Sequence, residues 1–257
     1  MKVHVVIPAR LASTRLPNKP LADIAGVPMI VRVVSQASRS QADTVVVAVD
    51  DERVAQVVVA AGYDAMLTAV DHASGSDRVM EVVRKRGWQD DDIVINVQGD
   101  EPLLPPALID DLAKAMQDNP GVEIATLAEP ISSAQDFLDP NVVKVVTDRD
   151  DVALYFSRAP IPFPRDNAQQ QTVTDAAVQA NHVRRHVGVY GFRVHALTRF
   201  ISLTESPLEN IERLEQLRWL EAGGRISVLH CSEAVPGGVD TPDDLVRVQR
   251  LIRQAER

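Results

Sequence analysis

The sequence contains a single cysteine, Cys231, so an internal disulfide and a cysteine-ligated metal site are both excluded. Cys231 follows a short apolar run at residues 226–229, which predicts a buried side chain that serves packing. The chain also lacks the GxGxxG turn and the GxxxxGK[ST] loop, two sequence patterns that bind nucleotide phosphates. A dinucleotide-dependent dehydrogenase is therefore a poor interpretation of this sequence.

Positive charge and long apolar runs are also scarce. The formal net charge is -9, which argues against a protein that grips a nucleic-acid backbone, because that task needs an extended basic face. No apolar run reaches the length of a membrane span, and the first one, residues 3–7, is too short for a signal-peptide core. We therefore expect a cytoplasmic protein that binds neither membranes nor nucleic acids.

The composition is that of a folded protein. Of the 257 residues, 45% are hydrophobic and 25% are charged, which is enough to bury a full core in one large domain. Apolar, β-branched runs at 44–49 and 92–97 alternate with segments of helical periodicity at 29–37, 52–61 and 77–86. This alternation predicts an α/β fold with a three-layer, mostly parallel, Rossmann-like sheet.

The pattern changes after residue 124, where strands follow one another without long helices between them. Runs at 142–146 and 152–156 flank a turn-like segment and predict a hairpin, and 187–192 returns as a strand. We predict a single domain over residues 1–257, in which residues 125–192 form a β-rich, antiparallel subregion. Apolar hairpin strands outside the main sheet need cover, so this subregion is also the expected two-fold interface.

Two further segments of the second half have clear local patterns. Residues 166–179 are polar and rich in glutamine, which predicts a loop. Residues 210–222 have apolar side chains at helical spacing and are followed by two glycines, which predicts one long amphipathic helix.

The first apolar run leads directly into a basic loop. We expect Pro8 to end the strand, and no acidic residue occurs before Asp23. The loop instead carries three cations, Arg10, Arg15 and Lys19. Ligands of open α/β sheets bind at the carboxyl ends of the strands, and clustered cations there suit a polyanionic phosphate. The alternative interpretation is a solvated basic loop.

Two other loops also follow predicted strands. Asp100 comes directly after the strand at 92–97, beside a glycine, where a carboxylate suits a hard cation such as Mg²⁺; a helix cap is the alternative. The loop HASGSDR at 72–78 contains Ser74 and Gly75, which allow a ligand to approach the backbone closely. The same residue types also simply make turns and helix caps.

Together, these motifs resemble the 3-deoxy-manno-octulosonate (Kdo) cytidylyltransferase family, also called CMP-Kdo synthetases, within the sugar nucleotidyltransferase superfamily. The resemblance spans nearly the whole chain, and the joint occurrence of its motifs in this order is highly specific. The motifs are IPAR at 7–10, STRLPNKPL at 13–21, HASGSDR at 72–78, NVQGDEPL at 96–103, NVVKVV at 141–146, ALYFSRAPIP at 153–162, HVGVYGF at 186–192, PLENIERLEQLR at 207–218 and VDTPDDL at 239–245.

The resemblance implies an activity and its cofactor. The anomeric hydroxyl of Kdo, an acidic sugar, would attack the α-phosphorus of CTP to give CMP-Kdo and pyrophosphate for lipopolysaccharide biosynthesis. Mg²⁺ would be held by Asp100 and Asp240, the positions that match the family's metal-binding acids. The resemblance also implies a nucleotidyltransferase fold and a homodimer.

The resemblance further implies a role for each site residue. Phosphoryl transfer asks the protein mainly to position groups and neutralise charge, so Arg10, Arg15 and Lys19 would clamp the β- and γ-phosphates. These three cations, with Asp100 and Asp240, are the expected catalytic residues. The expected nucleotide-binding residues are Arg10, Ser13, Arg15, Lys19, Ser74, Gly75, Arg78 and Gln98. The expected sugar-binding residues, suited to a carboxylate and hydroxyls, are Gln98, Arg158, Arg165, His186, Tyr190, Glu215 and Gln216.

The chain departs from the family pattern at three places. Asn18 stands where glycine is common, although asparagine tolerates left-handed backbone geometry better than most residues. Asp77 replaces a more common glutamate, and the PGGVDT turn is a residue shorter than usual, which bears on the position of Asp240. Without the resemblance, Glu215 and Gln216 would be interpreted as the exposed face of an amphipathic helix.

Two alternative functions stay open at the level of sequence. The sugar could be a related acidic one, an 8-amino analogue of Kdo or sialic acid, because the same phosphate and metal apparatus would serve it. An alternative from a different class is a non-catalytic nucleotide sensor that keeps the fold. The three intact cations and both acidic residues argue against such a sensor.

Overall fold

The computed structural model describes residues 1–12, 15–165, 173–231 and 235–255. Internal contacts divide the chain into two compact units: unit 1 is Met1–Gln117, Gly191–Thr198 and Val235–Arg257, and unit 2 is Asp118–Tyr190 and Arg199–Ala234. The expected single domain over 1–257, with its β-rich subregion at 125–192, stays a prediction. Among the described residues, none of the helices combines the length and the apolar character that a membrane crossing needs.

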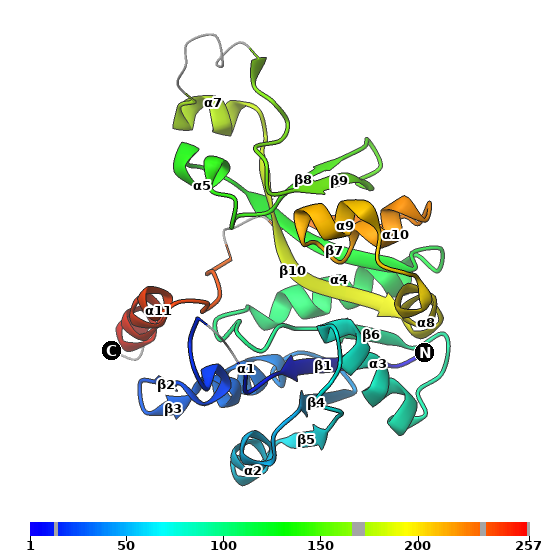
Figure 1. The fold of residues 1–257 in the computed structure, drawn as a ribbon, viewed down its shortest axis with the longest axis vertical. Coiled ribbons are helices and arrows are strands. Elements are labelled where there is room, and N and C mark those ends of the chain that lie inside the picture. Colours follow the sequence, from blue (N-terminus) through cyan, green and yellow to red (C-terminus); the bar gives the residue numbers. More distant parts are fainter. Residues whose placement is uncertain (13–14, 166–172, 232–234, 256–257) are drawn as a thin grey trace. The chain divides into compact units, whose positions relative to one another are not determined.

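Unit 1 is built on parallel strands. They are β1 (Val3–Ala9), β4 (Thr44–Val49), β5 (Asp64–Leu67) and β6 (Ile93–Asn96). The prediction that Pro8 ends the first strand is wrong, because β1 continues through Pro8 to Ala9 in register with β4. The central strand β1 pairs with β4 on one side and with β6 on the other, and β5 pairs with β4, all in parallel (Figure 1). The carboxyl ends of β1 and β6 therefore lie next to each other, and the loops that leave them start from one edge of the sheet.

Helices cover both faces of this sheet. The elements between and after the strands are η1 (Lys19–Leu21), the short hairpin β2 (Asp23–Ile24) and β3 (Val27–Pro28), α1 (Met29–Ala37), α2 (Glu52–Ala60), α3 (Gly75–Arg86), α4 (Pro106–Asp118) and α11 (Pro242–Ala255). Helices α1 and α2 contact each other and β4, whereas α3 packs against β1. The chain reverses direction across the sheet between β5 and β6, so right-handed crossovers place α3 on the opposite face. The predicted three-layer α/β class is confirmed.

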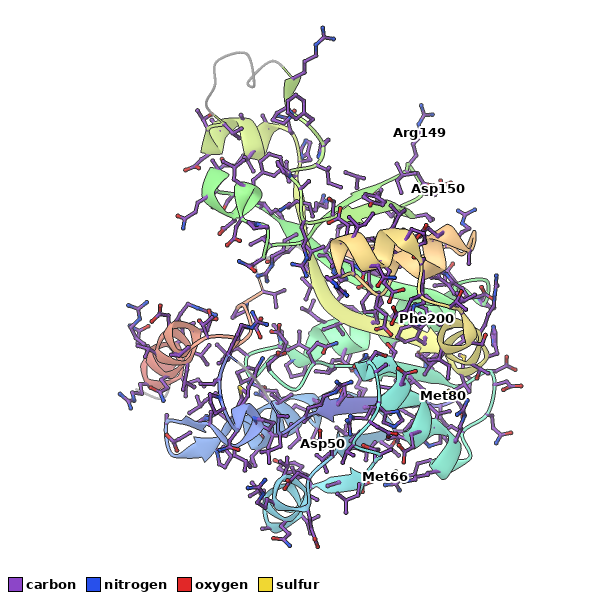
Figure 2. The ribbon with its side chains drawn as sticks, viewed as in Figure 1. Asp50, Met66, Met80, Arg149, Asp150 and Phe200 are labelled. Atoms are coloured by element: carbon purple, nitrogen blue, oxygen red, sulfur yellow. The ribbon has the colours of Figure 1, made fainter. Side chains whose placement is uncertain are left out.

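Unit 2 contains the antiparallel strands. Its strands are β7 (Ile124–Pro130), β8 (Lys144–Thr147), β9 (Ala153–Ser157), β10 (Arg184–Arg193, of which the last three residues belong to unit 1) and β11 (Ser227–His230). Strand β8 pairs antiparallel with β9 and β10, whereas β11 runs parallel to β7. This confirms the predicted hairpin, and Arg149 and Asp150 point outward from its turn (Figure 2).

The prediction of one helix over residues 210–222 is wrong. The helices of unit 2 are α5 (Ala134–Leu138), α7 (Asp175–Ala180), α8 (Val194–Ser202), which starts in unit 1, α9 (Pro207–Glu212) and α10 (Leu217–Glu221). Helix α9 starts early because Ser206 and Glu209 form a reciprocal cap, and it ends where Arg213 adopts a left-handed conformation with φ 54°. Ile211 is consequently left 78% exposed, while Trp219 of α10 is fully buried.

The predicted loop at 166–179 is only partly a loop. Residues 166–172 lie outside the described part of the chain. Asp175–Ala180 form helix α7 instead, because the Thr174 side chain accepts a hydrogen bond from the backbone N–H of Ala177 and caps the helix. The prediction that Cys231 is buried is confirmed.

A buried lysine organises the β8–β9 part of unit 2. Lys144 is fully buried, and its ammonium group donates to the carbonyl oxygens of Asp139, Val142 and Arg158 at 2.9, 2.6 and 2.7 Å. Burial lowers the pKa of Lys144, because the charged form loses its hydration. The three carbonyls together satisfy its three donors, so Lys144 ties the segment before β8 to the end of β9.

Candidate active site

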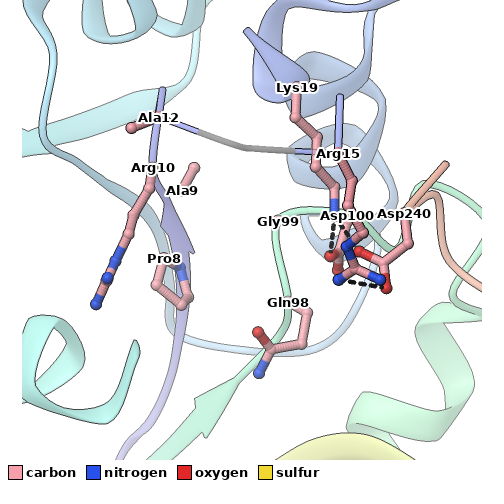
Figure 3. A pocket seen from close by; sticks show the side chains of 10 residues that line it. All are labelled: Pro8, Ala9, Arg10, Ala12, Arg15, Lys19, Gln98, Gly99, Asp100 and Asp240. Carbon is pink, nitrogen blue, oxygen red and sulfur yellow. Dashed lines mark hydrogen bonds and ion pairs between the residues drawn. The ribbon is translucent and has the colours of Figure 1, made fainter. Parts of the chain in front are cut away.

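A cavity of about 330 Å³ opens at the edge of unit 1 where β1 and β6 end. The residues that line it come from the loops after these two strands and from the turn before α11. They are Pro8, Ala9, Arg10, Ala12, Arg15, Lys19, Gln98, Gly99, Asp100 and Asp240 (Figure 3). The cavity thus contains all three predicted clamp cations and both predicted metal-binding acids.

Close packing of two loops brings Asp100 into the cavity. A Cβ atom on Gly99 would lie 2.8 Å from the carbonyl oxygen of Pro8, closer than real Cβ contacts. Only glycine therefore lets the loop after β6 approach the end of β1 this closely. The opening loop makes its own adjustment at Asn18, whose φ of 54° is left-handed and precedes η1. This is the geometry that asparagine tolerates in place of the family's glycine.

Lys19 joins the two acidic residues. Its ammonium nitrogen lies 2.6 Å from Oδ2 of Asp100 and 2.7 Å from Oδ1 of Asp240 (Figure 3). Burial of the Lys19 side chain, which is 13% exposed, acts to lower its pKa. The charge of Asp100 and the hydrogen bonds to Asp100 and Asp240 outweigh that effect and raise the pKa of Lys19. The lysine is therefore held in its charged form.

Asp240 reaches the cavity in spite of its shortened turn. Besides Lys19, it pairs with Arg15, whose Nη2 lies 3.2 Å from Oδ2 of Asp240. The Arg15 side chain is 61% exposed, so this pair contributes little to stability and Arg15 can move to meet a ligand. The structure therefore places Asp100 and Asp240 together, as the sequence motifs implied.

Arg10 faces a different neighbourhood. Its side chain points away from the Lys19, Asp100 and Asp240 cluster (Figure 3). It lies close enough to Arg78 for its charge to affect that buried side chain. Burial lowers the pKa of Arg78, the carboxylate of Asp50 opposes this effect and the charge of Arg10 adds to it. In this structure the three predicted clamp cations do not converge on one point.

Asp50 is a site residue that sequence reasoning missed. It follows β4 at the same edge of the sheet (labelled in Figure 2), and its Oδ1 accepts a hydrogen bond from the backbone N–H of Leu11 at 2.9 Å. Its Oδ2 lies 3.6 Å from Nη2 of Arg78, which is fully buried and also donates to the hydroxyl of Thr68. Asp50 thus anchors the basic loop to helix α3. Its position directly after a predicted strand was the available signal.

The residues predicted to bind the nucleoside have structural roles here. Ser74 caps α3 and exchanges hydrogen bonds with Asp77, which confirms the interpretation of this loop as a cap. Gly75 lies next to the Pro8 side chain, and Arg78 is buried. Ser13 lies outside the described residues. Nucleotide binding by Ser13, Ser74, Gly75 and Arg78 stays a prediction.

Several predicted sugar-binding residues lie together in unit 2. The rings of His186 and Tyr190 are 5.2 Å apart, and His186 Nε2 lies 3.0 Å from the hydroxyl of Thr126. Burial, with the nearby charge of Arg185, lowers the pKa of His186 to about 3, so this imidazole is neutral at physiological pH. Burial also raises the pKa of Tyr190, and the charge of Glu215 acts on it in the same direction.

Gln216, which follows Glu215 in the sequence, is buried. Its side chain is only 7% exposed, so the interpretation of Gln216 as part of an exposed helix face is wrong. The reason is the break at Arg213, which replaces the continuous helix by two short ones. Within the described residues, the Gln216 amide nitrogen has no hydrogen-bond partner. A buried donor of this kind is costly unless a ligand satisfies it.

The other predicted sugar-binding residues differ from this group. Arg158 donates to the carbonyl oxygens of Glu212 at 2.7 Å and Pro140 at 2.9 Å, so its guanidinium group is largely occupied within unit 2. Arg165 is exposed, and Gln98 lines the cavity of unit 1. Sugar binding by these residues stays a prediction.

The cavity holds one pair of side chains that suits a metal ion. The described ranges contain no group of three or more histidine, cysteine, aspartate or glutamate side chains that could hold one. Asp100 and Asp240 offer two carboxylates, and the ammonium group between them shows that this point attracts a cation. Mg²⁺ commonly binds through one or two carboxylates and takes its other ligands from phosphate and water. The residues present therefore fit such an ion.

Comparison with known proteins places this site in a family. A model of the cytidylyltransferase family matches residues 4–226. A relative from Cellvibrio japonicus (strain Ueda107), named 3-deoxy-manno-octulosonate cytidylyltransferase, is 50% identical over 252 residues, which cover 98% of each chain. The chain belongs to the 3-deoxy-manno-octulosonate cytidylyltransferase family.

Solved structures agree with this membership in the Kdo cytidylyltransferase family. A CMP:2-keto-3-deoxy-manno-octonic acid synthetase complexed with CTP is 42% identical, with a TM-score of 0.89, over 99% of this chain and 100% of that chain. A cytidylyltransferase from Leptospira borgpetersenii serovar Hardjo-bovis (strain JB197) is 14% identical, with a TM-score of 0.61, over 100% and 95% of the two chains. At that identity, the second match shows a shared fold alone.

We predict that Asp50→Asn destabilises the protein by about 3 kcal/mol, because the amide still accepts from Leu11 but leaves the buried charge of Arg78 without its carboxylate. Urea unfolding measures this loss in the free energy of unfolding. Asp51→Asn is the matched control and should change it little, because asparagine also caps α2 and the ion pair that Asp51 loses is with the exposed side chain of Arg53. Equal stability of the two variants would contradict the anchoring role of Asp50.

Proposed function

We propose that this chain catalyses the transfer of a cytidylyl group from CTP to Kdo, with release of pyrophosphate. The observation that carries the proposal is the cation and carboxylate cluster of Lys19, Asp100 and Asp240 at the strand ends of unit 1. Two similar proteins support the same reaction: a relative named 3-deoxy-manno-octulosonate cytidylyltransferase, and a solved CMP:2-keto-3-deoxy-manno-octonic acid synthetase complexed with CTP. The product would supply lipopolysaccharide assembly.

The reaction asks this chain to hold a triphosphate and to stabilise a leaving pyrophosphate. The sugar hydroxyl forms the new bond to the α-phosphorus as the bond to the β-phosphate oxygen breaks, and the departing group carries the negative charge. Arg10, Arg15 and Lys19 supply fixed or mobile positive charge around the cavity. Lys19 stays protonated because its pKa is raised, so it can neutralise phosphate oxygens throughout the reaction.

We further propose that Asp100 and Asp240 hold Mg²⁺. The cavity lining has three cations and two carboxylates, a small positive excess that does not neutralise a triphosphate. When bound, the ion would offset phosphate charge and assist ionisation of the attacking hydroxyl. The two carboxylates would orient the ion, and Lys19 would exchange its contacts with them for contacts with phosphate.

For the sugar, we propose the polar group of His186, Tyr190, Glu215 and Gln216, of which Gln216 is buried and the other three are half-buried. The neutral imidazole of His186 can donate a hydrogen bond to a hydroxyl or accept one from it, and the Gln216 amide nitrogen can donate a hydrogen bond. Arg158, Arg165 and Gln98 complete the set that the sequence motifs imply. An acidic sugar with many hydroxyls satisfies such a mixture of donors and acceptors.

We also propose that the protein works as a homodimer in the cytoplasm, where CTP is available. Unit 2 leaves the side chains of Leu154, Phe163 and Ile211 62%, 70% and 78% exposed, and apolar side chains of this size favour cover by a partner. Light scattering should give twice the chain mass of 28.1 kDa. A mass of one chain at micromolar concentration would contradict the dimer.

Pyrophosphate release from CTP should require Kdo. The purified protein is supplied with CTP and Mg²⁺ and with Kdo, its 8-amino analogue or sialic acid in turn, and kcat/KM is compared among the sugars. We expect the highest value with Kdo. Turnover of sialic acid but not Kdo would identify another acidic sugar as the substrate, and no turnover with any of the three would favour the non-catalytic nucleotide sensor.

Asp100→Ala should reduce Mg²⁺-dependent turnover by about 1,000-fold while the protein stays folded, because one of two charged ligands is lost from a preorganised site. Initial rates across a Mg²⁺ titration measure the loss, and circular dichroism checks the fold. Asp91→Ala, on the exposed segment before β6, is the control and should retain full activity. Retained activity in Asp100→Ala would remove Asp100 from the metal role.

A further inference from the structure

The turn that carries Asp240 is held against Asp100 by its backbone. The N–H of Val239 donates to the carbonyl oxygen of Asp100 at 2.9 Å. A Cβ atom on Gly238 would lie 2.7 Å from Oε1 of Glu101 and 2.9 Å from the Asp100 carbonyl oxygen, so this approach needs glycine. The position of the Asp240 carboxylate therefore depends on how firmly residues 237–240 are kept in place.

Arg247 of helix α11 also contacts this turn. Its Nη2 atom donates to the carbonyl oxygens of Gly237 and Gly238 at 3.0 and 2.9 Å. The Arg247 side chain is about two-thirds buried, with 35% exposed. Charge-assisted hydrogen bonds from a partly buried guanidinium group to backbone carbonyls are stronger than ordinary ones. Arg247 thus fixes the two glycines whose flexibility would otherwise let the turn move.

Asp244 connects Arg247 to Asp240. Its Oδ1 accepts from Nη2 of Arg247 at 3.1 Å, while its Oδ2 accepts from the backbone N–H of Asp240 at 3.2 Å. The same Oδ2 accepts from the N–H and hydroxyl of Thr241 at 3.0 and 2.8 Å, which makes Asp244 part of the cap of α11. A continuous chain of hydrogen bonds therefore runs from Arg247 through Asp244 to the backbone of Asp240.

We infer that Arg247 is a positioning residue, which acts with Asp244 to set the place of the Asp240 carboxylate for the divalent cation. The inference rests on the metal role of Asp240 in the proposed function. Groups that orient a metal ligand typically change metal affinity 10- to 100-fold when they are replaced. The C-terminal helix α11 is thus part of the metal site without supplying a ligand of its own.

The test is the affinity of Mn²⁺ for the protein in the presence of CTP and without any sugar, measured from the electron paramagnetic resonance signal of free Mn²⁺. Arg247→Gln should weaken this binding about tenfold. In turnover assays it should raise the Mg²⁺ concentration for half-maximal rate by a similar factor and leave kcat at saturating Mg²⁺ close to that of the wild type. Binding of Mn²⁺ at wild-type affinity would overturn the inference.

Arg250→Gln is the matched control. Arg250 is exposed on the same helix, and the described part of the chain shows no hydrogen bond or ion pair for it. This variant should bind Mn²⁺ like the wild type. A loss as large as that in Arg247→Gln would show that removing positive charge from α11 is sufficient, which would also overturn the inference.

A double-mutant cycle separates action through Asp240 from a general effect on the helix. In an Asp240→Asn background, Arg247→Gln should cause no further loss of Mn²⁺ affinity, because the ligand that it positions is gone. An undiminished loss in that background would overturn the inference while leaving the metal role of Asp240 intact. Wild-type Mn²⁺ affinity in Asp240→Asn alone would instead refute that metal role, and the inference with it.

If Arg247→Gln does not fold, Arg247→Lys takes its place in the same cycle. Lysine keeps the positive charge and places its donors on one nitrogen, as Nη2 does for Arg247, but its side chain differs in length and shape, so it can restore these contacts only in part. It should weaken Mn²⁺ binding less than glutamine would, and the loss should again disappear in the Asp240→Asn background. A loss that persists there would overturn the inference.

Discussion

The ammonium group of Lys19 lies between the carboxylates of Asp100 and Asp240, and the arrangement of unit 1 around the cavity depends on this contact. Three segments that are far apart in sequence must meet for it to form. Partly buried charges are favourable only when each has its partner. Loss of any one of the three would therefore leave a partly buried charge without a partner, which costs stability. The site is therefore held in a charged state before any substrate arrives.

Two glycines and two charged side chains allow the three segments that carry Lys19, Asp100 and Asp240 to come together. Gly99 lets the loop after β6 touch the end of β1, and Gly238 lets the turn before α11 touch the loop of Asp100. Asp50 and Arg247 then hold the two flanking segments, one by the backbone of Leu11 and the other by the backbone of Gly237 and Gly238. Close backbone approach and charged anchors together hold the segments that carry the carboxylates of Asp100 and Asp240.

In unit 2, burial affects two polar side chains, His186 and Gln216. His186 is kept neutral by its surroundings, and Gln216 is buried with an amide donor that no described residue satisfies. The unsatisfied amide of Gln216 costs stability, and a ligand that accepts its hydrogen bond would offset that cost. The helix break at Arg213 accounts for the burial of Gln216, because a continuous helix over 210–222 would have left this residue on an exposed face.

Much of the fold was predictable because it follows from local patterns. The apolar runs of β1, β4 and β6 and the periodicity of α1, α2 and α3 are signals that neighbouring residues carry by themselves. The prediction failed where local signals competed. In residues 207–221 the apolar periodicity continues through Arg213, but the cap at Ser206 and Glu209 starts a shorter helix and the left-handed residue ends it.

The sequence by itself determined the main strands and helices of the first half of the chain, the basic loop, the acidic residues of the site and the family, because these depend on residue types at fixed spacings. Only the tertiary structure decided which of these residues meet. In the folded chain, Arg10 points away from the carboxylates and Arg78 is buried beside Asp50. Arg247 donates hydrogen bonds to the turn that carries Asp240. The physical reason is that such contacts join segments up to 221 positions apart, as the pair of Lys19 and Asp240 shows. The residue pattern within a short segment does not indicate which distant segment it will contact.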